Sequence, residues 1–331
     1  MGLFSRVVRQ EREAPREGVV IEDCLECRVL GSATCFGVAA YSLRQIRVQP
    51  AQQTWFVAFG SAWIVLGCAA CVMTTVAPLH WVVTREPGRD VPDLPVFAAP
   101  AAAVTLGEDP SPSREVVDPS MGVFVLHNVL TASECEAIVA TSEAMGYTED
   151  APVSLGRNVR QNENCVWIVA PATNDKIFER ARPLLPPRIE FPRLTLEPVV
   201  GLNRRWRLYK YSESDVFKVH ADGAWTGSGL DTNGNLVADI YDGTCFSWLT
   251  FLIYLNDDFE GGTTSFFKRQ EGGDVAAAVF AVKPRRGSVL CFFHGHHPLS
   301  PLHQGDIVTS GVKYVARTDV LYKLPPPNLL E

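Results

Sequence analysis

Two imidazole groups and one carboxylate place the strongest constraint on what this chain can fold into, because one of the three is far from the other two in the sequence. His220 and Asp222 are separated by one residue, and His303 follows His220 by 83 residues. Side chains two positions apart lie on the same face of an extended strand, so His220 and Asp222 can bind one metal ion together. Two histidines and one carboxylate form the facial triad of non-haem Fe(II) sites, which leaves coordination positions free. The fold must therefore bring the strand that carries His303 beside the His-x-Asp segment.

Six further segments accompany these residues in a fixed order. They are FVLHNVLTASEC at 124–135, RLYKY at 207–211, LTFLIYLN at 249–256, GGTT at 261–264, PRRGSVLCFF at 284–293 and GVKYVARTDVLY at 311–322. With them, the region 121–324 resembles the Fe(II)- and 2-oxoglutarate-dependent oxygenases of the prolyl 4-hydroxylase type. A single His-x-Asp pair is common by chance, whereas ordered matches over roughly two hundred residues are specific.

The resemblance implies an α+β fold that is mostly β, namely a double-stranded β-helix, or jelly roll, with flanking helices. It implies Fe(II) held by His220, Asp222 and His303, with 2-oxoglutarate and O2 as co-substrates and ascorbate as reductant. In this chemistry 2-oxoglutarate is decarboxylated to succinate while a C–H bond is hydroxylated. The substrate is a protein side chain, such as that of proline, or a small molecule, and the sequence leaves this choice open.

The hydrophobic patterns agree with this class of fold. Strand-like runs bounded by turn residues occupy 205–211, 246–255, 279–282, 288–293 and 314–322. A helix is predicted from Cys135 to Met145. Thr131 and Glu134 have the spacing of a capping box at the start of this helix.

A cation ten residues after His303 is predicted to bind the co-substrate. Lys313 stands where the family places the partner of the distal carboxylate of 2-oxoglutarate, and a buried carboxylate needs such a counter-charge. Arg317 would lie on the same face of a regular strand, so it competes for this role; alternatively, it forms a structural ion pair with Asp319. Three more family positions line the co-substrate pocket or else belong to the barrel core: Thr250, Tyr254 and Tyr211.

Three other histidines compete with His303 as the third ligand. His294, His296 and His297 lie in a connection that contains Gly and Pro, where solvent-exposed histidines are expected. We prefer His303 because Lys313 follows it at the ten-residue offset of the family.

A polar insert at 225–245 separates the His-x-Asp pair from the next predicted strand. Asn233-Gly234-Asn235 suits a hairpin turn, so a small β-flap is predicted. Such a flap either shapes the choice of substrate at the mouth of the site or covers the surface without a role in catalysis.

Composition excludes some partners. The net charge of −7 argues against nucleic-acid binding, and no nucleic acid is expected as a partner. The nine cysteines are scattered over 331 residues, which is typical of reduced thiols and not of a disulfide framework.

The N-terminal third has the pattern of a membrane protein. Residues 55–79, which start at Trp55, carry no formal charge, and about twenty apolar residues suffice to cross a bilayer. A weaker run, 29–43 between Arg28 and Arg44, either crosses as well or lies in the interface. A transmembrane hairpin is therefore predicted.

The segment Asp23–Gly31, DCLECRVLG, resembles the start of a two-helix domain of mitochondrial proteins of the distal membrane-arm assembly type. This resemblance suggests the mitochondrial inner membrane, with the endoplasmic reticulum as the alternative. Cys24 and Cys27 form a CxxC pair, but a zinc site needs more ligands, and two small residues at a helix start explain the pair equally well.

Five regions follow from these patterns: an N-terminal tail (1–22), a membrane hairpin (23–84), a Pro- and Ala-rich linker (85–119), an oxygenase domain (120–324) and a C-terminal tail (325–331). The leading interpretation is a membrane-anchored dioxygenase. One alternative is a membrane scaffold with a catalytically silent barrel as an interaction module. Another is a cupin-type metal protein with a different reaction, which does not account for Lys313.

Overall fold

The structure is a computed structural model that describes residues 80–84, 94–108, 110–149, 159–191, 194–269 and 275–325. The predicted spans 29–43 and 55–79 and the Cys24/Cys27 pair lie outside the described residues. Within these ranges, no helix is long and apolar enough to cross a bilayer.

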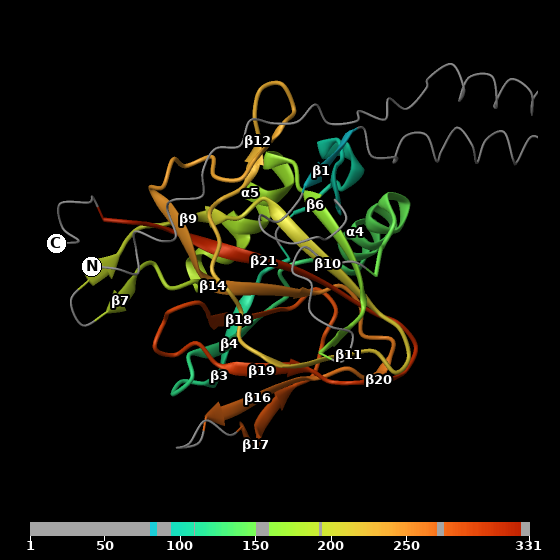
Figure 1. Cartoon of the computed structure of the whole chain (residues 1–331), viewed down its shortest axis with the longest axis vertical. Helices are drawn as coiled ribbons and strands as arrows, with labels where there is room; N and C mark the ends of the chain where they lie inside the picture. The colour runs from blue at the N-terminus through green and yellow to red at the C-terminus, as the bar shows by residue number, and fades with distance from the viewer. Residues whose placement is uncertain are drawn as a thin grey trace, which may run out of the picture. The chain divides into compact units, whose positions relative to one another are not determined.

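The described residues form two main sheets, drawn in Figure 1. The larger sheet contains, in spatial order, β1 (His80–Thr84), β2 (Leu94–Ala98), β6 (Glu163–Ile168), β10 (Arg205–Tyr211), β21 (Lys313–Lys323), β14 (Cys245–Tyr254), β18 (Val289–Phe293), β4 (Val123–His127) and β3 (Ser113–Asp118), with β9 (Val199–Leu202) also paired to β21. The smaller sheet contains β17 (Val275–Val282), β16 (Thr264–Arg269), β19 (Leu302–Gly305), β11 (Val216–His220) and β5 (Arg160–Gln161).

Short pairs and helices complete the described part. The pairs are β7 (Ile189–Phe191) with β8 (Leu194–Leu196), β12 (Gly229–Leu230) with β13 (Leu236–Val237), and β15 (Glu260–Gly261) with β20 (Val308–Ser310). The helices are α4 (Ala132–Met145), α5 (Pro171–Ala181) and the 3-10 turns η2 (Ala101–Ala103) and η3 (Arg182–Leu184). The mostly-β part of the fold prediction is thus confirmed.

The chain alternates between the two sheets. In sequence order, β10, β14, β18 and β21 belong to the larger sheet, and β11, β16, β17 and β19 lie between them in the smaller one. Neighbouring strands of this set pair antiparallel. Side chains from both sheets pack in one apolar cluster that includes Tyr209, Phe266, Phe292 and Val315. This packing holds strands that are distant in the sequence around a shared interior.

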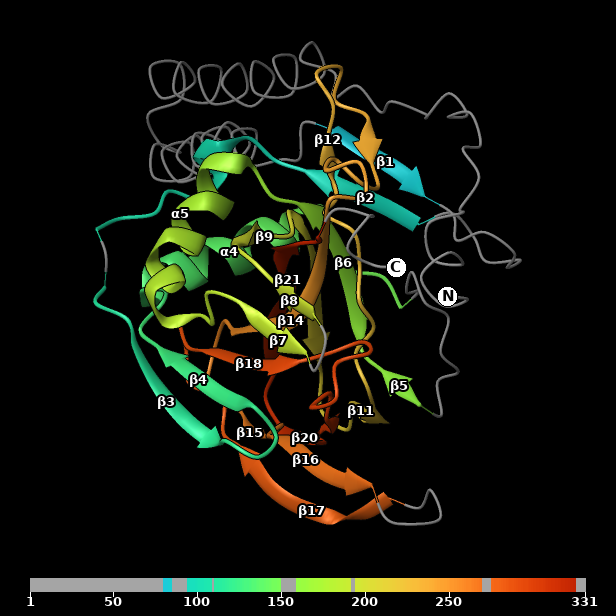
Figure 2. The same ribbon diagram turned by 90° about the vertical axis from the view of Figure 1, so that its left-hand side faces the viewer.

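The helices cover the face of the larger sheet that points away from the smaller sheet. Figure 2 shows α4 and α5 away from β16 and β17 of the smaller sheet. Trp206 and Leu208 of β10 belong to the same core cluster as Ile138 of α4 and Ile177 of α5. Tyr209, one residue on, belongs to the cluster between the sheets. The period of two along the strand therefore gives β10 one face for the helices and one for the interior.

The predicted capping box at the start of α4 is confirmed. The Thr131 hydroxyl accepts a hydrogen bond from the Glu134 N–H, and the Glu134 carboxylate accepts one from the Thr131 N–H at 2.8 Å. The same carboxylate forms a buried ion pair with Arg180 of α5 at 2.8 Å. Burial would raise the pKa of Glu134, but the hydrogen bonds from Arg180, Thr131 and Gly107 outweigh it and lower the pKa to about 2. A buried charge pair therefore joins the two helices.

The prediction of a linker over 85–119 is wrong for the part that the structure describes. β2 pairs in parallel with β6, and β3 pairs antiparallel with β4, so both strands belong to the larger sheet. Val104 and Leu106 are 3% and 8% exposed and belong to the main core. β1 likewise places 80–84, the end of the predicted membrane region, in this sheet. The folded domain therefore begins well before residue 120.

The β-flap predicted within the insert is present. β12 pairs with β13, and the Asp231 carboxylate accepts hydrogen bonds from the N–H groups of Asn233 and Asn235 at 2.8 Å in the turn between them. Leu230 and Leu236 pack against buried side chains of β2 and β6. The flap thus covers an edge region of the larger sheet.

Candidate metal and co-substrate site

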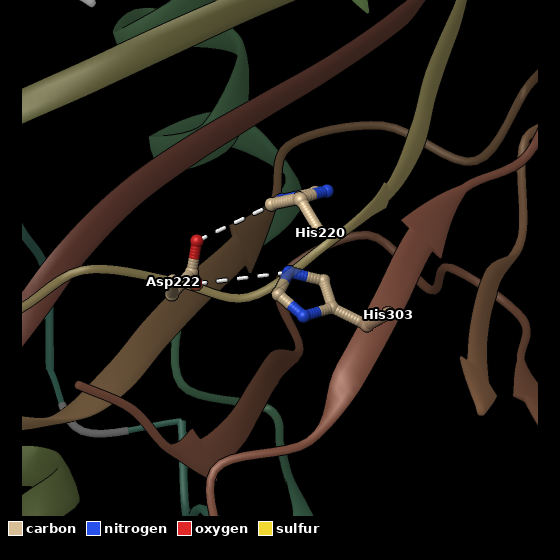
Figure 3. A group of neighbouring side chains, drawn as sticks. All are labelled: His220, Asp222 and His303. Atoms are coloured by element: carbon tan, nitrogen blue, oxygen red, sulfur yellow. Dashed lines mark ion pairs between the residues drawn. The ribbon is translucent and has the colours of Figure 1, made fainter. Parts of the chain in front are cut away.

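The structure brings the three predicted metal ligands together. His220 ends β11, His303 lies in β19, and the two residues are partners in the antiparallel register. Asp222 follows the end of β11 by two residues. One donor atom of each residue lies within 4.8 Å of the other two. The Nε2 atoms of His220 and His303 are each 3.7 Å from an oxygen of Asp222 (Figure 3).

The donor atoms fit a divalent iron ion. Nδ1 of His220 is 2.8 Å from the Lys218 carbonyl oxygen, and Nδ1 of His303 is 3.5 Å from that of Pro301. A carbonyl oxygen only accepts, so each Nδ1 carries the ring proton and each Nε2 keeps its lone pair for a metal. Two such nitrogens and a carboxylate oxygen are the ligand set of the Fe(II) facial triad.

The charge states of the three groups also suit metal binding. Burial, with the neighbouring His303 imidazole, lowers the pKa of His220 to about 3. Burial lowers the pKa of His303 as well. Burial would raise the pKa of Asp222, but the Arg317 guanidinium and the imidazoles outweigh it and hold that pKa below its usual range. Near neutral pH the site offers two neutral imidazoles and one carboxylate, which are the forms that bind metal.

A pocket between the two sheets contains both the triad and Lys313. Its walls are partly aromatic, with Tyr209 and Phe217 among them. The Phe217 ring stacks on the His220 imidazole with centroids 3.6 Å apart, which fixes the plane of the imidazole. The pocket-lining residues include none from the 225–245 insert, so the structure gives no support for the flap as part of the pocket wall.

Lys313 is a buried cation in this pocket. Lys313 is 3% exposed, and its Nζ donates a hydrogen bond to the Gly262 carbonyl oxygen at 2.7 Å. Nζ also lies 5.2 Å from the ring centre of Tyr211 and 5.9 Å from that of Tyr254. Burial lowers the pKa of Lys313 to about 8, and Asp306 opposes this shift only in part. Within the described residues, Lys313 forms no ion pair, so the pocket has a positive charge to offer a ligand.

The other predicted pocket residues divide into two groups. Thr250, Tyr211 and Arg317 line the pocket. The hydroxyl of Tyr254 is 2.8 Å from that of Thr264, which lines the pocket, so Tyr254 lies behind the wall.

Arg317 contacts acidic residues of the protein itself. Its Nη1 is 3.0 Å from Oδ1 of Asp222, and its Nη2 is 3.1 Å from Oδ1 of Asp319. The predicted ion pair between Arg317 and Asp319 is therefore present. Because Arg317 is already paired with Asp222 and Asp319, Lys313 is the better candidate for binding an external carboxylate.

The expectation of solvent-exposed histidines at 294–297 is wrong for two of the three. His294 is 0% exposed and His297 is 8% exposed, whereas His296 is exposed. The His297 imidazole stacks on the Phe293 ring with centroids 3.8 Å apart. Nδ1 of His294 is 2.9 Å from the hydroxyl oxygen of Thr250, so His294 lies directly behind a pocket residue. Sequence reasoning missed this second layer of the site.

Comparison with known proteins adds to this geometry. No family model matches the chain. Prolyl 4-hydroxylase 1 of Arabidopsis thaliana is 27% identical over 216 residues, which are 61% of this chain and 69% of that protein. The site and this relative together support a 2-oxoglutarate-dependent dioxygenase. That class uses Fe(II) and 2-oxoglutarate, and the pocket contains a group of side chains that could hold a metal ion together with a buried lysine.

Two solved structures are also similar. One is the viral collagen prolyl hydroxylase of Paramecium Bursaria Chlorella virus-1 in a complex with 2-oxoglutarate, with 16% identity, 61% of this chain and 97% of that chain covered, and a TM-score of 0.38. The other is a prolyl-4-hydroxylase of Pseudomonas putida, with 11% identity, 65% and 94% covered, and a TM-score of 0.34. The resemblance of Asp23–Gly31 to membrane-arm assembly proteins has no support from these comparisons.

Proposed function

We propose that this chain is a dioxygenase of the prolyl 4-hydroxylase type and that its catalytic domain is a double-stranded β-helix. The alternation of the strands from β10 to β21 between two sheets supports this fold. In this proposal His220, Asp222 and His303 hold Fe(II), and Lys313 binds the distal carboxylate of 2-oxoglutarate. When bound, the iron supplies the oxygen chemistry that couples decarboxylation of 2-oxoglutarate to hydroxylation of a C–H bond.

One observation carries the proposal: Lys313 is buried in the same pocket as the three ligands, and it has no carboxylate partner among the described residues. Asp306 is the acidic group that acts on it, but the Asp306 carboxylate already accepts hydrogen bonds from Thr263, Ser265 and Gln304. A buried charge is costly unless it is paired. A dicarboxylate that reaches the metal with one end and Lys313 with the other would provide that pair.

The remaining pocket residues orient the ligands and exclude water. Phe217 stacks on His220, and the ring centroids of Phe292 and His303 are 4.5 Å apart. Thr250 donates a hydrogen bond to Oδ2 of Asp222 at 2.8 Å. These contacts keep the donor atoms in place before a metal arrives, which is what a preorganised site requires.

We infer that the substrate is a protein side chain, with a prolyl residue as the first candidate. The support is the 27% identity to the Arabidopsis thaliana protein named prolyl 4-hydroxylase 1. A small molecule is the alternative substrate.

Iron binding and 2-oxoglutarate turnover test this function. The full-length protein is reconstituted with Fe(II) without oxygen, and turnover is then measured with ascorbate and proline-containing peptides. We expect His220→Ala, Asp222→Ala and His303→Ala each to lose iron while the domain stays folded, and His296→Ala, at an exposed histidine, to keep it. Loss of iron in His296→Ala with retention in His303→Ala would refute the ligand assignment. A wild-type protein that binds no iron and consumes no 2-oxoglutarate would favour the silent-scaffold alternative.

We further propose that the segment with the runs 29–43 and 55–79 anchors the enzyme in a membrane, and that this membrane is the mitochondrial inner membrane. The support is the sequence alone, namely the uncharged run and the resemblance at Asp23–Gly31. Release of the full chain by a carbonate wash would contradict the anchor. Fractionation against markers of both compartments decides between mitochondria and the endoplasmic reticulum.

A further inference from the structure

We propose that His294 and Arg317 are positioning residues for Asp222, each acting on one of its two carboxylate oxygens. The inference rests on the proposed function, because it takes Asp222 to be a metal ligand. Ser247, His294 and Thr250 form what we call the histidine arm, and Arg317 with Asp319 forms the arginine arm. All of these side chains are buried next to the triad without belonging to it.

The histidine arm is a continuous chain of hydrogen bonds that ends on Asp222. The Ser247 hydroxyl oxygen is 2.9 Å from Nε2 of His294, and Nδ1 of His294 is 2.9 Å from the Thr250 hydroxyl oxygen. The Thr250 hydroxyl is 2.8 Å from Oδ2 of Asp222. Ser247, His294 and Thr250 are each 0% exposed, so bulk water does not compete for these bonds.

The two ends of this arm fix the direction of every hydrogen bond. A carboxylate oxygen accepts, so Thr250 gives its one hydroxyl proton to Asp222. Thr250 then accepts from Nδ1–H of His294, and the neutral ring accepts from the Ser247 hydroxyl at Nε2. The Ser247 oxygen in turn accepts the Trp225 backbone N–H at 2.8 Å. Each donor has one acceptor, and a neutral His294 agrees with burial, which lowers its pKa to about 4.

The backbone ties the same segment to the ligand. The Gly295 N–H donates to the Asp222 carbonyl oxygen at 3.0 Å. Gly295 has φ +63°, and a Cβ there would lie 2.9 Å from Cβ of Ala224, so this close approach favours glycine. The residues that follow β18 thus act on Asp222 in two ways: Gly295 binds its main chain directly, and His294 acts on its carboxylate through Thr250.

The arginine arm holds the other oxygen. Nη1 of Arg317 is 3.0 Å from Oδ1 of Asp222, while Nη2 donates to Oδ1 of Asp319 at 3.1 Å and to the Gly223 carbonyl oxygen at 3.2 Å. The guanidinium is planar, so acceptors on both amino groups fix its orientation. With a donor on each oxygen, Asp222 cannot turn about its Cβ–Cγ bond without breaking a buried hydrogen bond. Partners of this kind orient metal ligands and raise the affinity for the metal.

The histidine arm is tested by calorimetric titration of the metal-free, full-length protein with Mn(II) alone. Thr250→Val removes one hydroxyl while it keeps the shape and the charge, and we expect the Kd for Mn(II) to rise by about 10- to 100-fold, the range for partners of metal ligands. Thr250→Ser, which keeps the hydroxyl, should restore most of the affinity. Thr318→Val is the matched control, because Thr318 is also 0% exposed and its hydroxyl donates to Asn203 outside both arms. It should leave the Kd unchanged.

Three further variants extend the test to His294 and to the arginine arm. His294→Leu should weaken Mn(II) binding as Thr250→Val does, while His294→Asn keeps a donor toward Thr250 and should bind more tightly than His294→Leu. The double variant Arg317→Gln/Asp319→Asn removes one positive and one negative charge, so it tests orientation and not net charge, and its Kd should also rise.

The outcomes separate this inference from the proposed function. A wild-type protein that binds Mn(II) no better than His303→Ala refutes the metal site itself. A wild-type protein that binds Mn(II), together with a folded Thr250→Val that binds equally tightly, refutes the histidine arm alone. An unchanged Kd in the folded double variant refutes the arginine arm. Thermal unfolding of each metal-free protein reports whether it is folded, and His294→Asn against His294→Leu decides the question if Thr250→Val unfolds.

Discussion

The ammonium group of Lys313 is buried and forms no ion pair within the described residues, which makes its removal informative. In Lys313→Ala the distal carboxylate of 2-oxoglutarate would lose its counter-charge, and breaking a buried pair in this way costs about 3–5 kcal/mol. At about 1.4 kcal/mol per factor of ten, the apparent KM for 2-oxoglutarate should rise by roughly two to three and a half orders of magnitude. Iron binding should stay nearly unchanged. Steady-state kinetics and iron titration measure the two quantities separately.

Arg317→Ala should have a different effect from Lys313→Ala. Arg317 pairs with Asp222 and Asp319, so its loss should act first on metal binding and much less on the KM for 2-oxoglutarate. If Arg317→Ala raised that KM more than Lys313→Ala did, the carboxylate would be bound by Arg317.

Lys313 also predicts how co-substrate binding depends on pH. Burial lowers its pKa to about 8 in the ligand-free protein, and the charged form is the one that pairs with a carboxylate. The Kd for 2-oxoglutarate should therefore be flat below pH 8 and rise above it, by up to about tenfold per pH unit. Lys313→Arg keeps its charge over this range and should flatten the profile. Calorimetry on the metal-loaded proteins checks this, and a wild-type Kd that stays constant well above pH 8 would contradict it.

The sequence identified the residues of the site that carry a motif and missed those that depend on packing. His220, Asp222, His303 and Lys313 have a fixed spacing, and the fold places them in one pocket. His294 has no spacing of its own, and a Gly- and Pro-containing context predicted exposure. A weaker signal was available: His294, the residue after β18, continues the period of two of Leu290 and Phe292, which both face the interior cluster.

At the scale of elements, the ion pair between Glu134 and Arg180 joins α4 to α5, and both side chains are 3% exposed. Glu134→Gln removes the negative charge and leaves Arg180 buried without its partner, so the free energy of unfolding should fall by about 3–5 kcal/mol. The pKa of Glu134 agrees, because its lowering from 4.5 to about 2 corresponds to roughly 3 kcal/mol. This stability is present above pH 4.5 and is lost as the pH falls toward 2.

Urea unfolding at neutral pH measures this effect, and the chain offers a matched control on the same helix. Glu136 pairs with Arg286 at 3.0 Å, but its side chain is 68% exposed. Glu136→Gln should therefore change the stability by about 0–1 kcal/mol. Equal losses in the two variants would show that burial does not decide the contribution of the Glu134 pair.

Strands with a strong hydrophobic pattern were predictable, and strands that depend on a distant partner were not. The runs that predicted β10, β14, β18 and β21 contain alternating or continuous apolar residues, and these strands lie in the middle of the larger sheet. β2 and β3 fall in a Pro- and Ala-rich stretch of the sequence, and they lie toward opposite edges of the larger sheet. β3 is an edge strand with mostly exposed residues, and β2 lies next to the edge strand β1, so their own sequences carry little signal. The pairing of β3 with β4 and of β2 with β6 decides their structure.

At the scale of the whole molecule, the segment 94–118 is part of the folded domain, and this changes where a stable fragment must start. Leu106 and Val104 are buried in the main core, and the carbonyl oxygens of Leu106 and Gly107 accept hydrogen bonds from Lys176 and Arg180. A fragment of residues 120–331 loses these contacts together with β2 and β3. Burial of a large aliphatic side chain contributes about 1.5–3 kcal/mol, and a domain has only about 5–15 kcal/mol in total.

We therefore expect the fragment 80–331 to unfold cooperatively and the fragment 120–331 to be destabilised by at least about 5 kcal/mol, because two core side chains and the acceptors for Arg180 are removed at once. Circular dichroism melts and limited proteolysis of the two purified fragments compare them directly. Among the described residues, a third fragment, 94–331, lacks β1, whose pairing partner there is β2, so its melting temperature should stay close to that of 80–331. If 120–331 melted at the same temperature as 80–331, the strands within 94–118 would not be needed for folding. The predicted domain boundary at residue 120 would then be correct.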